Sequence, residues 1–282
     1  MRLKNSIVFY IVCIMLVCIC SGKVQAASQV GISLKSGESN SSYDVTGDGV
    51  KDTVRVELTD NVKPTDEDGR TGMIQVFVND NIVFEQKREA DPCWNVKLIK
   101  LANGKVFFDI ESTVMSEDDC IHQLYIWENG KLKSVYDFQK YFNKYASYCF
   151  VDIVKVSGNT INTEVRAQFH TTGMVRFNMN IVYKDGVFKR TSNTFTPKYK
   201  AMSRKNKWTA GKKIKVYKKA GSKKTAYTLK KGNVVKLNKI IYKNNKVYFQ
   251  IKNNNGKGKR GYIPAAKKYS YPQYFKESQY AG

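Results

Sequence analysis

Hydrophobic and polar residues alternate along most of the chain in short runs, and two-residue turn signals separate one run from the next. Val, Ile, Tyr and Phe fill alternate positions of these runs. Alternation with a period of two predicts half-buried strands, and Asn-Gly or a related pair between two runs predicts a tight hairpin. The pattern therefore predicts an almost entirely antiparallel β protein. Turns are expected at 103–104, 129–130, 158–159, 185–186, 244–245 and 255–256.

One segment departs from this alternation. Between Asp137 and Tyr148, aromatic residues recur at intervals of three and four, which is typical of one face of a helix. We therefore expect a short helix in this segment and strands elsewhere. The aromatic residues are Phe138, Tyr141, Phe142 and Tyr145.

The first 26 residues have the pattern of a secretory signal. Two basic residues precede an apolar stretch from Ile7 to Cys20, and Val24-Gln25-Ala26 offers a signal-peptidase site. Cleavage would leave no stable membrane span, because the stretch is shorter than the about 20 apolar residues that cross a bilayer. A retained signal anchor is the alternative. We expect a secreted or cell-surface protein whose Ser- and Gly-rich residues 27–40 form a flexible arm.

Charge divides the chain into two unequal parts. Residues 198–282 contain 25 Lys and Arg residues and one acid, Glu277, whereas residues 27–197 contain 20 basic and 23 acidic residues. The formal net charge of +24 therefore belongs almost entirely to the last third. A basic surface concentrates polyanions and says nothing about catalysis. We place a β-rich domain at 41–197 and a basic linker at 198–207.

The mature chain would keep three cysteines, Cys93, Cys120 and Cys149. An odd number in an oxidising compartment allows at most one intramolecular disulfide. Cys93 and Cys120 precede strand-like segments that enter the sheet from the same end, which makes them the preferred pair. Three buried, reduced thiols are the alternative.

An acidic loop lies at the start of the β-rich domain. The segment 44–52 has oxygen-bearing side chains at its first, third, fifth and ninth positions, and Gly49 at the sixth allows a tight turn. Hard cations such as Ca²⁺ take about six to eight oxygen ligands, which such a loop can supply. An EF-hand is disfavoured, because its twelfth position is Arg55 and the following residues alternate like a strand.

This loop resembles the strand-flanked calcium loop of FG-GAP and VCBS repeats, D-x-[DNT]-x-D-G-x-x-D, which those families carry on β-propeller blades. The alternative is an acidic turn closed by Asx hydrogen bonds without metal. The region to Pro197 is too short for several blades, so a meander, a sandwich or a blade-like sheet is expected. The resemblance implies a Ca²⁺ site with side-chain ligands Asp44, Thr46, Asp48 and Asp52, to which Val50 would add its carbonyl oxygen.

The basic third of the chain carries a second ordered pattern. Lys215-Val216-Tyr217 is followed by a turn at 228–232, an aromatic strand at 247–251 and a closing Arg260-Gly261-Tyr262-Ile263. In this order the elements resemble a bacterial SH3-like domain over 208–268, with a more basic last loop and a tyrosine in place of the commoner tryptophan. Members of that family bind cell-wall peptides or polymers, often beside a hydrolase domain. The resemblance implies a small β-barrel that targets the cell wall.

Tyrosines interleaved with basic residues are the candidate ligand-binding residues of this domain. Aromatic rings can stack on sugar or peptide while cationic groups meet phosphodiester or carboxylate. The alternative is that the tyrosines fill the barrel core and the lysines solvate it. A Tyr-rich tail, 269–282, either packs on the domain or lies on ligand. The candidates are Tyr217, Tyr242, Tyr248, Lys257, Lys259, Arg260 and Tyr262.

Residues suited to catalysis are scarce. The chain has two histidines, His122 and His170, and lacks the zinc-peptidase, hydrolase-elbow and phosphate-loop motifs. We therefore expect a protein without enzymatic activity that binds an anionic cell-wall polymer or peptidoglycan on a Gram-positive type of cell. We expect no nucleic acid as partner.

Two other functions remain open at this level. A wall-lytic hydrolase in 41–197 would use Cys149 with His170, or a pair of carboxylates. An adhesin would bind sulfated host glycans through the same basic surface. The carboxylate candidates are Asp109 or Glu111 with Glu117, Asp118 or Asp119.

Overall fold

The computed structural model describes residues 30–62, 70–88, 93–113, 121–199, 205–253 and 258–278. These residues form four antiparallel sheets and two single turns of 3₁₀ helix, which confirms the expected all-β class. The signal segment 1–26 lies outside the described residues. Among the helices within the described ranges, none is long and apolar enough to cross a membrane.

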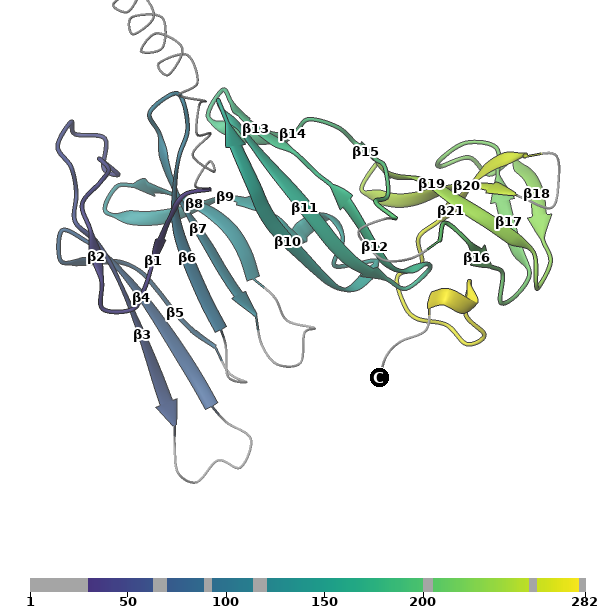
Figure 1. Cartoon of the computed structure of the whole chain (residues 1–282), viewed down its shortest axis with the longest axis horizontal. Helices are drawn as coiled ribbons and strands as arrows, with labels where there is room; N and C mark the ends of the chain where they lie inside the picture. Colours follow the sequence, from purple (N-terminus) through teal and green to yellow (C-terminus); the bar gives the residue numbers. More distant parts are fainter. Residues whose placement is uncertain are drawn as a thin grey trace, which may run out of the picture.

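The first two sheets pack face to face (Figure 1). The first sheet has the order β1-β6-β7-β8-β9, and the second has the order β2-β3-β4-β5. Buried side chains such as Val56, Ile74, Leu98 and Phe108 form the core between them. This arrangement is a sandwich, one of the expected architectures. The strands are β1 (Ile32–Leu34), β2 (Ser39–Asn40), β3 (Val54–Val62), β4 (Arg70–Val78), β5 (Asn81–Arg88), β6 (Cys93–Lys100), β7 (Val106–Thr113), β8 (Ile121–Glu128) and β9 (Lys131–Asp137).

Strands β1 and β2 correct the expectation of a flexible arm at 27–40 for the residues that the structure describes. Ile32 and Leu34 pair with Leu98 and Val96 of β6, and Ser39–Asn40 pairs with β3. Leu34 is buried in the sandwich core. The short alternation of apolar residues thus outweighs the high Ser and Gly content, because it lets this segment cover a sheet edge.

The third sheet contacts the other face of the first sheet. Neighbouring residues of a strand point to opposite faces, so Phe108 faces the sandwich core while Phe107 faces away from it. The Phe107 ring lies 5.0 Å from that of Tyr183 and 4.9 Å from that of Phe188. The strands of the third sheet are β10 (Ala146–Ser157), β11 (Thr160–Phe169), β12 (Gly173–Asn178), β13 (Ile181–Lys184) and β14 (Val187–Arg190).

The fourth sheet has the order β15-β19-β20-β21-β17-β18, and β16 also pairs with β19. It occupies the green and yellow end of the molecule in Figure 1. Its buried face carries apolar residues such as Val216, Phe249 and Ile263. The strands are β15 (Thr194–Phe195), β16 (Trp208–Thr209), β17 (Ile214–Tyr217), β18 (Thr225–Leu229), β19 (Val234–Lys243), β20 (Lys246–Asn253) and β21 (Arg260–Pro264).

The third and fourth sheets share one hydrophobic core. The rings of Phe169 and Phe249 lie 5.2 Å apart, and the Trp208 indole N–H donates to the Thr172 carbonyl at 3.0 Å. Strand β15, which precedes the charge step at Pro197, pairs with β19 beyond it. The hydrophobic core therefore continues across the position near Pro197 at which the chain becomes strongly basic.

The described part of the Tyr-rich tail packs back on the fold. Phe275 is 1% exposed, and the Gly211 N–H donates to the Tyr274 carbonyl at 2.9 Å. The 3₁₀ helix η3 (Lys276–Ser278) brings the Glu277 carboxylate to the Thr209 N–H, at 2.7 Å. Of the two sequence alternatives for the tail, the structure shows packing on the domain around Phe275 and Ser278, whereas Tyr271 is exposed.

The expected helix at 137–148 is wrong beyond a single turn. Only Gln139–Tyr141 form a 3₁₀ helix, η1, whose start is held by the Asp137 carboxylate, which accepts the N–H of Gln139 at 2.8 Å. The chain then enters β10 at Ala146. The aromatic spacing reflects burial of Phe138 and Phe142 in the core rather than a helix face.

The hairpin turns agree with the sequence at five of the six expected positions, and the sixth, 255–256, lies outside the described residues. At 129–130 the chain needs two positive φ angles, 50° at Asn129 and 81° at Gly130, which these residues tolerate. One further turn, Asn79–Asp80 between β4 and β5, was not expected from the sequence.

Candidate functional site

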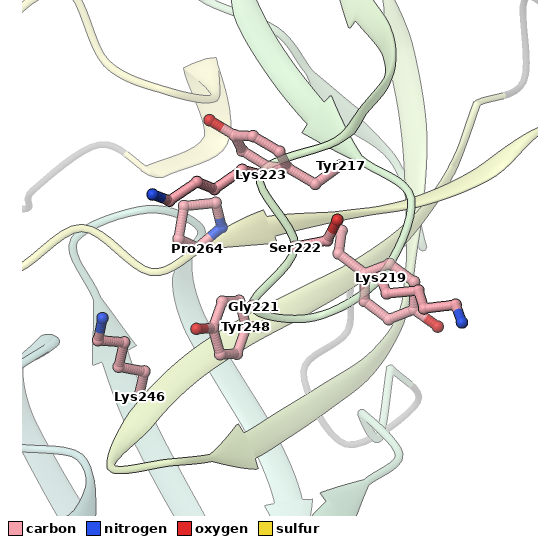
Figure 2. Close-up of a pocket in the computed structure, with 9 residues that line it drawn as sticks. Tyr217, Lys219, Gly221, Ser222, Lys223, Lys246, Tyr248 and Pro264 are labelled. Atoms are coloured by element: carbon pink, nitrogen blue, oxygen red, sulfur yellow. The ribbon is translucent and has the colours of Figure 1, made fainter.

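A groove on the fourth sheet brings together three of the predicted ligand-binding tyrosines. It has a volume of about 280 Å³ and is hereafter the tyrosine groove. The close-up in Figure 2 shows the loop that contains Gly221 and Ser222 passing between Tyr217 and Tyr248. Its lining residues are Tyr217, Lys219, Gly221, Ser222, Lys223, Lys246, Tyr248, Tyr262 and Pro264.

The strand registers place the tyrosines on the same face. Tyr217 of β17 pairs with Tyr262 of β21, and Tyr248 of β20 pairs with Pro264 of β21. The residues between them along each strand are buried in the core, so the groove residues point to the opposite face. The Gln250 side-chain amide donates to the Tyr262 hydroxyl at 2.8 Å and fixes this ring.

Three lysines surround the tyrosine groove. Lys219 and Lys223 come from the loop between β17 and β18, and Lys246 begins β20. In Figure 2, Lys223 and Lys246 extend on one side of the groove and Lys219 on the other. Sequence reasoning missed these three residues as site residues. The available signal was the basic loop that directly follows Tyr217.

Gly221 lets this loop approach the groove. Its φ is +82°, a conformation that L side chains rarely adopt, and a Cβ atom at this position would lie 3.5 Å from the Tyr248 hydroxyl. The loop therefore forms one wall of the groove with its main chain.

The other predicted ligand-binding residues lie outside the groove. Tyr242 contacts the Arg190 guanidinium, 4.3 Å from its ring centroid, and lies 5.3 Å from the Tyr141 ring. Lys259 and Arg260 are exposed, Lys259 just before β21 and Arg260 at its start. Lys257 lies outside the described residues. The structure thus brings Tyr217, Tyr248 and Tyr262 together but not Tyr242.

The basic third of the chain has little internal charge compensation. Its one acid, Glu277, is engaged with the Thr209 N–H. Lys198 reaches across to Glu164 of β11 and forms an ion pair. Lys212 lies over the Tyr274 ring at 4.0 Å, and burial lowers the pKa of its ammonium group. Among the described residues, no carboxylate forms an ion pair with the exposed lysines of the fourth sheet.

The acidic loop 44–52 is closed by hydrogen bonds from its own main chain. The Asp44 carboxylate accepts the N–H of Gly47 at 2.6 Å and that of Gly49 at 2.8 Å. Asp52 is 2% exposed and accepts the N–H of Val45 at 2.7 Å. Burial alone would raise the pKa of Asp52, but its hydrogen bonds from Thr46, Asn79 and Val45 lower it below the ordinary value.

Calcium binding by this loop stays a prediction. The loop brings Asp44, Thr46 and Asp52 together, since the Thr46 hydroxyl lies 3.4 Å from both carboxylates. Asp48 accepts the N–H of Val50 at 2.8 Å, while Val50 itself is 67% exposed. Among the residues that the structure describes, no group of three or more His, Cys, Asp or Glu side chains is placed to hold a metal ion.

The two described cysteines differ in their exposure to solvent. Cys93 is exposed at the start of β6, and its predicted partner Cys120 lies outside the described residues, so that pairing stays a prediction. The Cys149 side chain is fully buried in the core opposite Ala167. His170 donates its main-chain N–H to Tyr145, and burial lowers the pKa of its ring. Within the described residues, the Cys149 thiol is therefore not exposed to solvent.

The candidate carboxylates are only partly described by the structure, so a carboxylate pair stays a prediction. Asp109 is buried and bonded to His122, with 2.7 Å between Oδ1 and Nε2. Glu111 is half-buried on the same strand. Its proposed partners, Glu117, Asp118 and Asp119, lie outside the described residues.

Comparisons with protein-family models, with characterised proteins and with solved structures gave no match to this chain. The resemblances to SH3-like domains and to FG-GAP loops therefore stay predictions from the sequence.

Proposed function

We propose that this protein is a non-enzymatic, secreted or surface-attached binder of an anionic bacterial cell-wall polymer, and that the tyrosine groove is its binding site. The observation that supports this is a groove of three tyrosines surrounded by three lysines, on a sheet whose chain segment contains one acid. The aromatic rings offer stacking area, and the ammonium groups offer charge that nearby side chains leave uncompensated.

Binding of this kind has a defined salt dependence. Exposed charges separated by more than about 8 Å are largely screened at physiological ionic strength, so affinity for a polyanion falls as salt rises. Stacking on tyrosine is much less sensitive to salt. We therefore expect binding that weakens with ionic strength but leaves a residual, tyrosine-dependent part.

The test is a sedimentation assay of the mature chain with purified bacterial cell walls across a salt series. Tyr217→Ala and Tyr262→Ala should each weaken binding about five- to tenfold, the loss expected for one aromatic contact. The matched control is Tyr271→Ala, because Tyr271 is 93% exposed and lies outside the groove.

Several outcomes would overturn the proposal. Absence of wall binding at low salt, or equal losses for Tyr217→Ala and Tyr271→Ala, would reject the groove as the site. Tighter binding to heparin than to walls would favour the sulfated-glycan adhesin. Clearing of peptidoglycan in a zymogram would favour the hydrolase.

A further inference from the structure

Three basic residues stand side by side across the middle of the fourth sheet. In the antiparallel registers Lys236 of β19 lies directly opposite Lys252 of β20, and Lys252 lies directly opposite Arg260 of β21. Their neighbours along the strands, Leu237 and Ile251, are buried, so the three basic side chains share the outer face. We call these three residues the basic row. Adjacent strands are about 4.8 Å apart, so the row places three cations within roughly 10 Å.

Such a row is unfavourable for the sheet by itself. Like charges directly opposite one another in a sheet are destabilising, whereas opposite charges or aromatic pairs stabilise it. The single acid of the basic third, Glu277, is occupied at β16. Lys236 and Arg260 are exposed, and the described residues that flank the row supply no carboxylate. An external anion would relieve this repulsion.

Part of the row is held in place. A Cβ atom on Gly258 would lie 2.7 Å from Cε of Lys252, so the Lys252 stem packs against the main chain of this glycine. Gly258 has a φ of +66°, which also disfavours larger residues. Lys252 is therefore half-buried and less free to move away from its charged neighbours than a fully exposed lysine.

The basic row lies next to the tyrosine groove. Gln250 pairs with Tyr262, which lines the groove, and Lys252 pairs with Arg260 two residues further along the same strands. Two residues of a strand span about 6.7 Å. The same face of the sheet thus presents the Tyr262 ring and, two residues further along the strands, the basic row.

Resting on the proposed function, we propose that the basic row is a second subsite, which holds a phosphodiester group of a linear polymer whose neighbouring polyol unit lies on Tyr262 in the groove. A glycerol-phosphate repeat has the same number of backbone bonds as two peptide residues, so its extended length of about 7 Å matches the step between the subsites. The Arg260 guanidinium supplies a bidentate donor pair for phosphate oxygens, and the lysines add charge.

The test compares two double variants that remove equal charge from the mature chain. One is Lys236→Gln with Lys252→Gln in the basic row. The other is Lys230→Gln with Lys231→Gln, two exposed lysines in the turn between β18 and β19. The probe is an oligo(glycerol phosphate) of fixed length, and poly-γ-glutamate of matched charge is the comparison ligand.

The row variant should lose at least about tenfold in affinity for oligo(glycerol phosphate), and the turn variant less than about threefold, a difference of about 0.7 kcal/mol or more. The row variant should lose less affinity for poly-γ-glutamate than for oligo(glycerol phosphate). Its midpoint of thermal unfolding should equal or exceed that of the unchanged protein, because like-charge repulsion is removed. Unchanged stability also separates lost binding from misfolding.

Equal losses in the two double variants would overturn the basic row while leaving the wall-binding proposal intact. Equal losses for both ligands would overturn the preference for phosphodiester. Failure of the proposed function is distinguishable, because the unchanged protein would then bind neither cell walls nor the phosphate polymer.

Discussion

Asp109 and His122 form a buried hydrogen-bonded pair in the first sheet. The His122 side chain is 3% exposed, that of Asp109 is 4% exposed, and the His122 ring lies 4.4 Å from the Phe138 ring. Burial by itself lowers the pKa of His122, but the Asp109 carboxylate outweighs it and raises the pKa above 6.5, with help from Glu111 and against Lys97. The folded protein therefore holds a proton on His122 more tightly than the unfolded chain does.

This pair predicts a pH-dependent stability. Since the folded pKa is raised, the contribution of His122 to the free energy of unfolding is fully present below about pH 6.5 and is lost as pH rises through the folded pKa. Asp109→Asn should therefore cost about 3 to 5 kcal/mol at the acidic end of this range and less at alkaline pH. Urea unfolding at a series of pH values measures this difference.

Glu111→Gln is the control for that experiment, because Glu111 lies opposite His122 but is half-exposed. We expect a small change from this variant at every pH. A loss in Asp109→Asn that does not vary with pH would contradict the assignment of the proton to His122.

The contact between Asp109 and His122 could not be predicted from the sequence. Their contact depends on the register between β7 and β8, in which Glu111 faces His122 and Asp109 faces Leu124. Asp109, a candidate catalytic acid from the sequence, has a side chain that is 4% exposed and is paired with His122. The pairing register of β7 with β8 is a long-range property that the local sequence pattern does not specify.

At the scale of elements, the acidic loop 44–52 is held in shape by hydrogen bonds within the protein. Main-chain N–H groups donate hydrogen bonds to the Asp44 and Asp52 carboxylates, and the Asn79 side-chain amide donates one to Asp52 at 2.6 Å. A loop held in this way loses little further chain entropy when a cation binds. The remaining carboxylate lone pairs are the ones on which calcium binding depends.

We expect calcium to stabilise the protein through this loop, by about 2.7 kcal/mol at one hundred times the dissociation constant. Asp48→Asn should weaken or abolish the effect, because Asp48 is exposed and supplies one of the predicted ligands. Asp80→Asn removes an equal charge from an exposed turn and should change nothing. Thermal unfolding with calcium and with chelator checks this, and no shift with calcium would contradict the site.

Elements were easier to predict than the site that they build. The alternation and the turn pairs gave nearly all hairpins, since both signals are local. The tyrosine groove depends on Tyr217 pairing with Tyr262 and on the loop carrying Lys219 and Lys223 folding over Tyr248. Local patterns do not specify such long-range contacts. Tyr242 shows the same limit, because its alternation in β19 looks like that of the groove tyrosines, yet it packs on Arg190.

For the whole molecule, hydrophobic packing and charge follow different boundaries. The charge changes near Pro197, whereas the core runs from the third sheet into the fourth through Phe169 and Phe249. The sandwich of the first two sheets has a core of its own, which contains Phe108. Net charge is a surface property, so the charge distribution along the sequence locates the basic third of the chain but does not indicate which strands unfold together.

Shared packing predicts shared stability. Phe249→Ala should cost about 3 to 5 kcal/mol and should speed amide hydrogen exchange in β11 as well as in β20, because one core serves both sheets. Phe108→Ala should instead speed exchange mainly in β4 and β7. Protection in β11 that is unaffected by Phe249→Ala would show that the third and fourth sheets are independent.

The contact between η3 and the start of β12 has a consequence for biosynthesis. A Cβ atom on Gly173 would lie 2.9 Å from the Glu277 carbonyl oxygen, and Phe275 pairs with Ala210. Translation delivers Gly173 long before it delivers Phe275 and Glu277. In a nascent chain that stalls before these residues leave the ribosome, the apolar surface that Phe275 covers would stay exposed to solvent. Proteases and chaperones should recognise that intermediate first.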